Sequence, residues 1–181
     1  MFCCKTQVKA VTPDVLNNEV RKMAYTGYSK RNWDIMNKYN AWQLIFPPVK
    51  DLIGTPAFDA YIAKALNDSD AGYKKPSPMY KHYFFKAVLW PAVERRLKTR
   101  PFDQVLNEVL TEEYQVNGGW ERDRKEIREL FTFEYLMTHP EKITDLKAFK
   151  ASNCFPVALD LLKVRAAFDS SLKKQVDYFT N

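Results

Sequence analysis

The stretch YKHYFFKAVLWPAVERRLKTRP, residues 80–101, has an aromatic and apolar first half and a basic second half. Its apolar side chains occupy two sides of the expected helix: Tyr83, Ala87 and Trp90 on one, Phe85, Val88 and Leu89 on the other. A helix that is apolar nearly all round is typical of deep burial, inside a bundle or between subunits. We expect this segment to be buried in that way, with Pro91 either kinking the helix or dividing it in two.

A membrane span is excluded for the same stretch, because crossing a bilayer takes roughly 20 largely apolar residues. Its apolar run is about half that length, Lys86 interrupts the run, and four cations follow. Two surface roles remain as alternatives to burial. Phe84 and Phe85 could dip into a membrane interface while Arg95 and Arg96 meet anionic headgroups, or the cations could meet RNA.

Prolines mark the starts of most other expected helices, and the 181 residues fit one domain. The expected helices cover residues 13–26, 32–46, 56–66, 78–100, 101–117, 120–137, 145–151 and 156–176. The last helix carries Phe168 on its apolar face, and one longer loop lies near 67–78. No segment alternates apolar and polar residues as a strand does. The sequence therefore predicts an all-α, bundle-like single domain of about seven to eight helices over residues 12–181, preceded by a short arm, 1–11.

The net charge of +6 is unevenly placed along the chain. Residues 1–100 hold 17 Lys and Arg against 8 Asp and Glu, whereas residues 101–181 hold 11 against 14. The N-terminal half could therefore face an acidic partner such as nucleic acid, anionic lipid or an acidic protein surface. The alternative is that the two halves neutralise each other after folding.

A set of cations in the first half is the candidate contact surface for an anionic partner: Lys74, Lys75, Lys81, Arg95, Arg96, Lys98 and Arg100. Neighbouring tyrosines could stack on bases while these cations meet phosphates. However, the sequence holds no RNP-like motif, KH loop, zinc finger or basic zipper. An RNA- or nucleoprotein-binding module is therefore the alternative function.

The three cysteines, Cys3, Cys4 and Cys154, do not form a disulfide framework, which indicates a reducing, intracellular compartment. Cys3 and Cys4 are candidate acylation sites beside a lysine. Lys5 and Lys9, with no acid before residue 14, weakly resemble an organellar presequence, so a mitochondrial location is a hypothesis.

The sequence predicts no catalytic, cofactor-binding or metal-binding residues. It lacks a nucleophile elbow, a P-loop, a metalloprotease motif and the paired Glu-x-x-His of a di-metal bundle. The segment ERDRKEIRE, residues 121–129, pairs opposite charges four residues apart and indicates an exposed salt-bridged face. An enzyme with a site built from scattered residues such as Tyr80, His82 and His139 is a third hypothesis.

The leading hypothesis is a non-catalytic accessory or structural subunit that acts through protein–protein contacts inside a larger complex. It rests on the excess of aromatic residues, some of which we expect to stay exposed and to meet a protein partner. The candidate interface residues are Trp42, Phe46, Phe84, Phe85, Trp90 and Phe155. An accessory subunit of an organellar complex and a viral matrix-like protein both fit this description.

Overall fold

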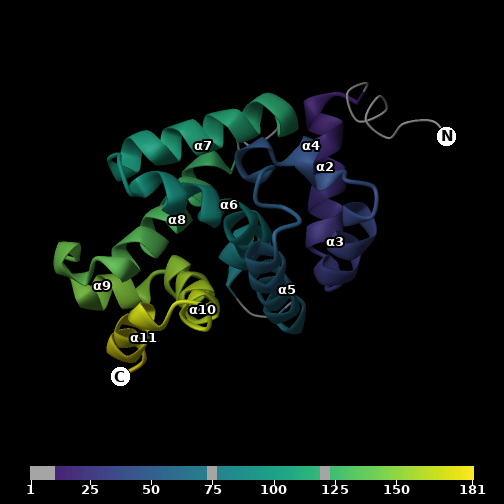
Figure 1. The fold of residues 1–181 in the computed structure, drawn as a ribbon. Helices are drawn as coiled ribbons and strands as arrows, with labels where there is room; N and C mark the ends of the chain where they lie inside the picture. The colour runs from purple at the N-terminus through teal and green to yellow at the C-terminus, as the bar shows by residue number, and fades with distance from the viewer. Residues whose placement is uncertain (1–10, 73–76, 119–122) are drawn as a thin grey trace.

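The computed structural model describes residues 11–72, 77–118 and 123–181, and over these residues the chain is all-α, without strands (Figure 1). The described α-helices are α2 (Pro13–Ala24), α3 (Ser29–Asn37), α4 (Trp42–Ile45), α5 (Pro56–Ala71), α6 (Tyr83–Leu97), α7 (Phe102–Asn117), α8 (Arg124–Thr138), α9 (Leu146–Ala151), α10 (Cys154–Ala166) and α11 (Lys173–Thr180). Short 3₁₀-helices lie at η1 (Pro47–Val49), η2 (Pro78–His82), η3 (Pro140–Lys142) and η4 (Ser170–Leu172). Eight of these ten helices have seven or more residues, so the predicted all-α fold of about eight helices is confirmed.

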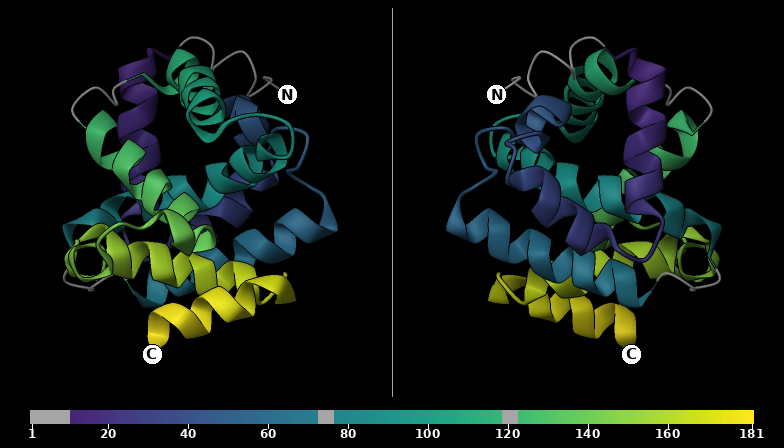
Figure 2. Two further views of the ribbon diagram at one scale, coloured as in Figure 1. Left: turned by 90° about the vertical axis from the view of Figure 1, so that its left-hand side faces the viewer. Right: turned by 90° about the vertical axis from the view of Figure 1, so that its right-hand side faces the viewer.

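Helix α6 is the centre of the fold. Ten of its fifteen side chains are buried, and it packs against α5, α7 and α8. In the ribbon views α7 and α11 lie at opposite ends of the molecule, with α6 between them (Figure 1, Figure 2). The deep burial predicted from its all-round apolar pattern is confirmed, and its neighbours belong to the same chain.

Pro91 does not divide α6, which runs unbroken from Tyr83 to Leu97. A proline has no N–H, so the carbonyl four residues earlier loses its helical donor. That carbonyl belongs to Ala87, and the hydroxyl of Tyr61 on α5 donates a hydrogen bond to it at 2.9 Å. A side chain from the neighbouring helix thus replaces the missing backbone bond.

The N-terminal core is built on stacked aromatic rings. Trp33 and Trp42 lie parallel, with ring centroids 4.8 Å apart, and the indole N–H of Trp42 donates to the carbonyl of Trp33 at 2.9 Å. Phe46 and Phe84 pack against the ring of Trp42 at centroid distances of 5.6 and 6.1 Å. A second, smaller core gathers Met137, Leu162 and Phe179 from α8, α10 and α11.

One expected helix and one expected loop have different bounds in the structure. The expected helix 32–46 is broken into α3 and α4, because the chain turns at Asn40, whose φ of 51° is left-handed and ends a helix. The expected loop 67–78 is shorter than predicted, because α5 continues to Ala71 through Asp and Ser residues.

The expected last helix is also divided. It ends at Ala166, and the Asp169 carboxylate then accepts a hydrogen bond from the backbone N–H of Ser171 and begins η4, which leads into α11. Such side-chain capping favours a new helix start over continuation. Phe168 therefore lies in the turn rather than on a helix face.

No helix in the described part of the chain combines the length and the apolar character that crossing a membrane requires. The predicted arm, residues 1–11, falls outside the described residues except for Val11.

Candidate functional site

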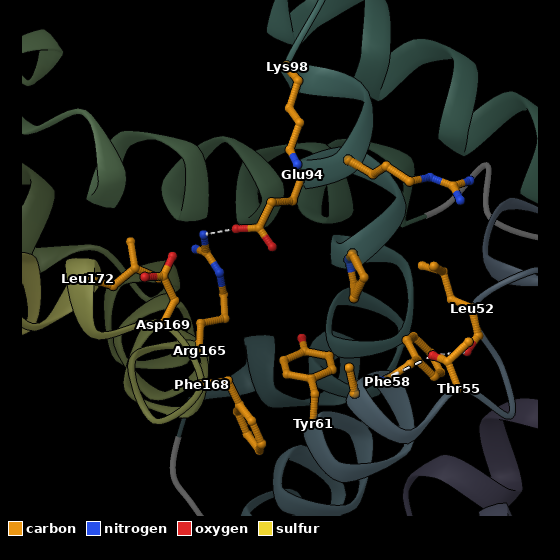
Figure 3. A pocket seen from close by; sticks show the side chains of 13 residues that line it. Leu52, Thr55, Phe58, Tyr61, Glu94, Lys98, Arg165, Phe168, Asp169 and Leu172 are labelled. Carbon is orange, nitrogen blue, oxygen red and sulfur yellow. Dashed lines mark hydrogen bonds and ion pairs between the residues drawn. The ribbon is translucent and has the colours of Figure 1, made fainter.

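A pocket of about 510 Å³ opens where α5, α6 and the end of α10 meet (Figure 3). Its apolar lining includes Leu52, Phe58, Tyr61, Pro91, Phe168 and Leu172. Its charged lining consists of Glu94, Arg95, Lys98, Arg165 and Asp169. A cavity of this size, mostly apolar with a few convergent polar groups, has the properties of a binding site.

Phe168 is the exposed apolar group of the pocket. It follows α10, where the chain turns toward η4, and the residue is 51% exposed. The ring meets that of Tyr61 edge-on, with centroids 6.2 Å apart. The fold thus leaves a large aromatic side chain half exposed to solvent at the pocket.

Arg165 is the buried polar group of the pocket, with 6% of the residue exposed. Its guanidinium donates from Nη1 to Glu134 at 2.6 Å and from Nη2 to Glu94 at 2.5 Å, and it lies over the ring of Trp90. Burial alone lowers the pKa of Arg165, but the two carboxylates outweigh burial and raise it. Arg165 therefore stays charged, as charge-assisted hydrogen bonds require.

Behind Arg165 lies a fully buried ion pair between Lys86 and Glu134. Lys86 Nζ donates to Glu134 Oε2 at 2.8 Å and to the carbonyl of Val157 at 3.1 Å, and both charged side chains are 0% exposed. Burial lowers the pKa of Lys86, and the neighbouring Glu134 opposes that shift. The two carboxylates, Glu134 and Glu94, thus balance the two cations, Lys86 and Arg165.

Sequence reasoning did not find this network. In the sequence Lys86 only interrupts an apolar run, and Glu134 belongs to no recognisable motif. A lysine inside a helix that is otherwise apolar all round was the available signal, since an isolated buried charge is costly and calls for a partner.

The mouth of the pocket carries two cations, Arg95 and Lys98. Both are exposed, and within the described ranges no carboxylate lies at ion-pair distance from either. Asp169, also at the pocket, caps η4, and its hydrogen bonds with Ser171 lower the pKa of its carboxyl. The mouth therefore has a net positive charge.

The other predicted contacts for an anionic partner are engaged within the chain or lie elsewhere. Arg96 makes a two-pronged pair with Glu112 at 2.8 and 2.9 Å, and Arg100 pairs with Glu108 at 2.6 Å. Lys81 pairs with Glu126 at 2.7 Å. Lys74 and Lys75 lie outside the described residues. For the paired cations, the two halves of the chain neutralise each other, as the alternative interpretation expected.

Most of the candidate interface residues do not lie on the surface. Trp42, Phe46, Phe84, Phe85 and Trp90 are at most 2% exposed, because α6 and the α3–α4 turn fold their rings into one core. Phe155 is partly buried and packs on the rings of Phe149 and Phe179 in the second core. In the described structure these six rings therefore belong to the two cores.

The three residues of the enzyme hypothesis have separate partners. Tyr80 donates a hydrogen bond to Asp160, while His139 stacks on Tyr135. His82 Nε2 lies 2.8 Å from Glu126 Oε2, and burial lowers the pKa of His82 to about 4.

Three ligand atoms that could hold a metal ion converge at His82, Asp123 and Glu126, all within 4.8 Å of one another. However, Lys81 pairs with Glu126 and Arg21 with Asp123. In the described structure these cations already neutralise the two carboxylates.

The cysteines add no site to the described structure. Cys154 is buried, which raises the pKa of its thiol to about 11 and makes it a poor nucleophile at neutral pH. The predicted acylation sites, Cys3 and Cys4, lie outside the described residues.

Comparison with known proteins does not assign the pocket to a family. No model of a protein family matches the chain, and no curated protein shows significant sequence similarity to it. The chemistry of the pocket itself is therefore the basis for assigning a function.

Proposed function

We propose that the protein is a non-catalytic accessory subunit that binds a segment of a partner protein in the pocket between α5, α6 and α10. The single observation that carries this proposal is one pocket lined by the half-exposed Phe168 and by Arg95 and Lys98, two cations without an ion-pair partner among the described residues. Exposed aromatic and Arg side chains together are the composition that protein interfaces favour.

The volume of the pocket sets the size of the bound segment. At about 510 Å³ it lies in the range of ligand sites and can hold a few side chains of a partner. Phe58, Leu172 and Phe168 offer apolar contact area for one of these side chains. The proposed partner segment therefore carries an apolar residue as its anchor.

The positive charge of the pocket mouth determines which charge the partner segment should carry. Arg95 and Lys98 attract a negative group and speed its association, an effect that added salt screens. An acidic segment of a protein partner matches both the apolar lining and the cations. That the complex is mitochondrial stays a prediction, since it rests on Lys5 and Lys9 outside the described residues.

The test is a selection of binding peptides from a random library displayed on phage, followed by fluorescence anisotropy with the purified full chain. Phe168→Ala is expected to weaken the selected peptides by about tenfold or more, as loss of a central anchor does. Tyr178→Ala is the matched control, because Tyr178 is 48% exposed on α11, away from the pocket lining.

Two results would count against the proposal. One is a selection that yields no specific peptide, and the other is a set of peptides whose affinity is the same in Phe168→Ala and in Tyr178→Ala. Within a successful selection, Lys98→Glu should weaken acidic peptides more than Lys147→Glu, which reverses an exposed cation on α9.

A further inference from the structure

We propose that Glu94 is an internal substitute for a carboxylate of the partner, and that the partner's C-terminal carboxylate replaces Glu94 on Arg165 when it binds. This inference rests on the proposed function and names the chemistry that the pocket recognises: a carboxylate attached directly beside an apolar side chain. Figure 3 shows Glu94 and Arg165 joined across the pocket from α6 and α10.

The two carboxylates on Arg165 differ in how easily they can leave. Glu134 is fully buried and also pairs with Lys86, so its departure would leave the buried Lys86 without a carboxylate and Arg165 with Glu94 alone. Glu94 is 49% exposed, and in the described structure Arg165 is its one ion-pair partner. The Glu94 carboxylate is already half solvated and gains hydration on moving fully into water, so Glu94 is the exchangeable partner.

The guanidinium of Arg165 also has an unused donor. Glu94 contacts Nη2 with a single oxygen, and Nε is buried without a hydrogen-bond partner among the described residues. Nε and Nη2 form one edge of the guanidinium, which can donate two parallel hydrogen bonds to one carboxylate. An incoming carboxylate placed on this edge would satisfy both donors, whereas Glu94 satisfies one.

The displaced Glu94 has a second cation within reach. Lys98 follows it by four residues on α6, so the two side chains lie on the same face of the helix, with the acid on the N-terminal side as such pairs favour. While Glu94 is paired with Arg165, Lys98 has no carboxylate partner in the described ranges. After the exchange Arg165, Glu94 and Lys98 would each have a partner of opposite charge.

A C-terminal residue fits the spacing of the two recognition groups. Arg165 and Phe168 lie one helical turn apart, joined by the hydrogen bond from the Phe168 N–H to the Arg165 carbonyl at 2.9 Å. A terminal carboxylate and its own side chain share one Cα, so both can reach these neighbouring groups. Charge balance excludes an amide or an amine at the same place, because either would leave Arg165 with one carboxylate fewer.

The test uses n-hexanoate and its neutral isostere hexanamide as probes of the full chain. Binding is followed by two-dimensional ¹H–¹⁵N NMR on the Nε–H signal of Arg165. We expect hexanoate, and not hexanamide, to move this signal. Glu94→Gln is expected to bind hexanoate about tenfold more tightly than the unaltered chain, because the internal competitor is gone.

Asp169→Asn is the matched control. It removes one negative charge from the same pocket, while asparagine keeps the ability to cap η4, and in the described structure the Asp169 carboxylate accepts no hydrogen bond from the Arg165 guanidinium. A smaller gain for Asp169→Asn than for Glu94→Gln supports exchange. Equal gains, or no gain for Glu94→Gln, would overturn it, because general electrostatics or no competition at all would then explain the data.

Two further arms keep the proposal falsifiable if Glu94→Gln folds poorly. Lys98→Gln leaves the Arg165 network intact and is expected to weaken hexanoate severalfold, since the displaced Glu94 loses its second partner; unchanged binding would contradict the exchange. Peptides from the library selection are also compared with their C-terminally amidated forms. Equal affinity of the two forms would reject a C-terminal carboxylate as the ligand.

The hexanoate and peptide measurements distinguish failure of the carboxylate exchange from failure of the proposed function. If hexanoate shows the expected preferences and no peptide binds, the partner segment is rejected and the carboxylate exchange stands. If peptides bind through Phe168 and Glu94→Gln changes nothing, the partner segment stands and the exchange is rejected.

Discussion

Glu113 on α7 is a carboxyl group that the fold buries away from any cation in the described structure. It is 1% exposed, Asn117 donates a hydrogen bond to one of its oxygens, and the other oxygen has no hydrogen-bond partner within the described ranges. Asn117 in turn donates to the carbonyl of Ile45 at 2.7 Å, which ties α7 to α4. Burial raises the pKa of Glu113 well above its ordinary value, so the folded state favours the protonated form.

This burial makes the free energy of unfolding depend on pH. Because the pKa of Glu113 is raised in the folded state, its contribution is fully present below the unfolded value and is lost as the pH rises through the folded value. Glu113→Gln should therefore flatten the decline in stability on the alkaline side. Urea unfolding from about pH 4 to about pH 9 measures this. Glu112→Gln, whose carboxylate is partly exposed and paired with Arg96, is the control and should keep the decline.

Lys86 should be far more costly to remove than a surface lysine. Lys86→Met takes one of the two cations from the fully buried Glu134, and we expect it to lower the free energy of unfolding by about 3 kcal/mol. Lys64→Met breaks an exposed pair with Asp68 and should cost at most about 0.5 kcal/mol. Similar small losses for both variants would show that the buried pair contributes no more than a surface pair.

At the scale of elements, the continuity of α6 depends on a side chain from α5. The Tyr61 hydroxyl supplies the hydrogen bond that Pro91 removes from the Ala87 carbonyl. Because one group compensates for the other, their effects on stability should be coupled.

A double-mutant cycle tests this coupling. Tyr61→Phe should lower the free energy of unfolding by about 1–3 kcal/mol, since it leaves a buried carbonyl unpaired. In a Pro91→Ala background the same change should cost less, because the new N–H at position 91 can bond the Ala87 carbonyl. Urea unfolding of the four proteins gives the coupling energy, and strictly additive losses would refute the compensation.

The positions of several helices could be predicted from the sequence, and the pocket could not. Pro13, Pro56 and Pro78 begin helical segments as predicted, because local backbone restrictions act there. The sequence predicts Phe168 on the apolar face of a continuous helix. In the structure α10 ends at Ala166 and the Asp169 cap begins a new helical turn, so Phe168 lies between helices. The pocket needs α5, α6 and α10 to meet, which no local pattern records.

At the scale of the whole molecule, the described residues form two cores that meet at Phe133. The larger core surrounds α6, and the smaller one holds Phe149, Phe155 and Phe179 between α8 and α11. The unequal charge of the two halves of the chain partly disappears across this structure, since Arg96 and Arg100 meet acids of α7.

When one ring of the smaller core is removed, that core should unfold locally while the larger core stays folded. Phe179→Ala removes a ring that is 3% exposed and contacts Phe149 and Phe155. We expect amide hydrogen exchange to speed up in α9–α11 while α6 keeps its protection. Lys174→Ala, at an exposed position of α11, should leave both regions unchanged. Equal acceleration in α6 would show a single cooperative unit.

The parallel pair of Trp33 and Trp42 has an optical consequence. The two indoles stand on either side of the turn at Asn40, with centroids 4.8 Å apart and planes inclined by 13°. At this separation their electronic transitions couple, so the pair should give an exciton signal in circular dichroism that neither ring gives alone. The protein thus carries its own pair of coupled chromophores. Circular dichroism can therefore report, without any label, whether α3 and α4 are packed together.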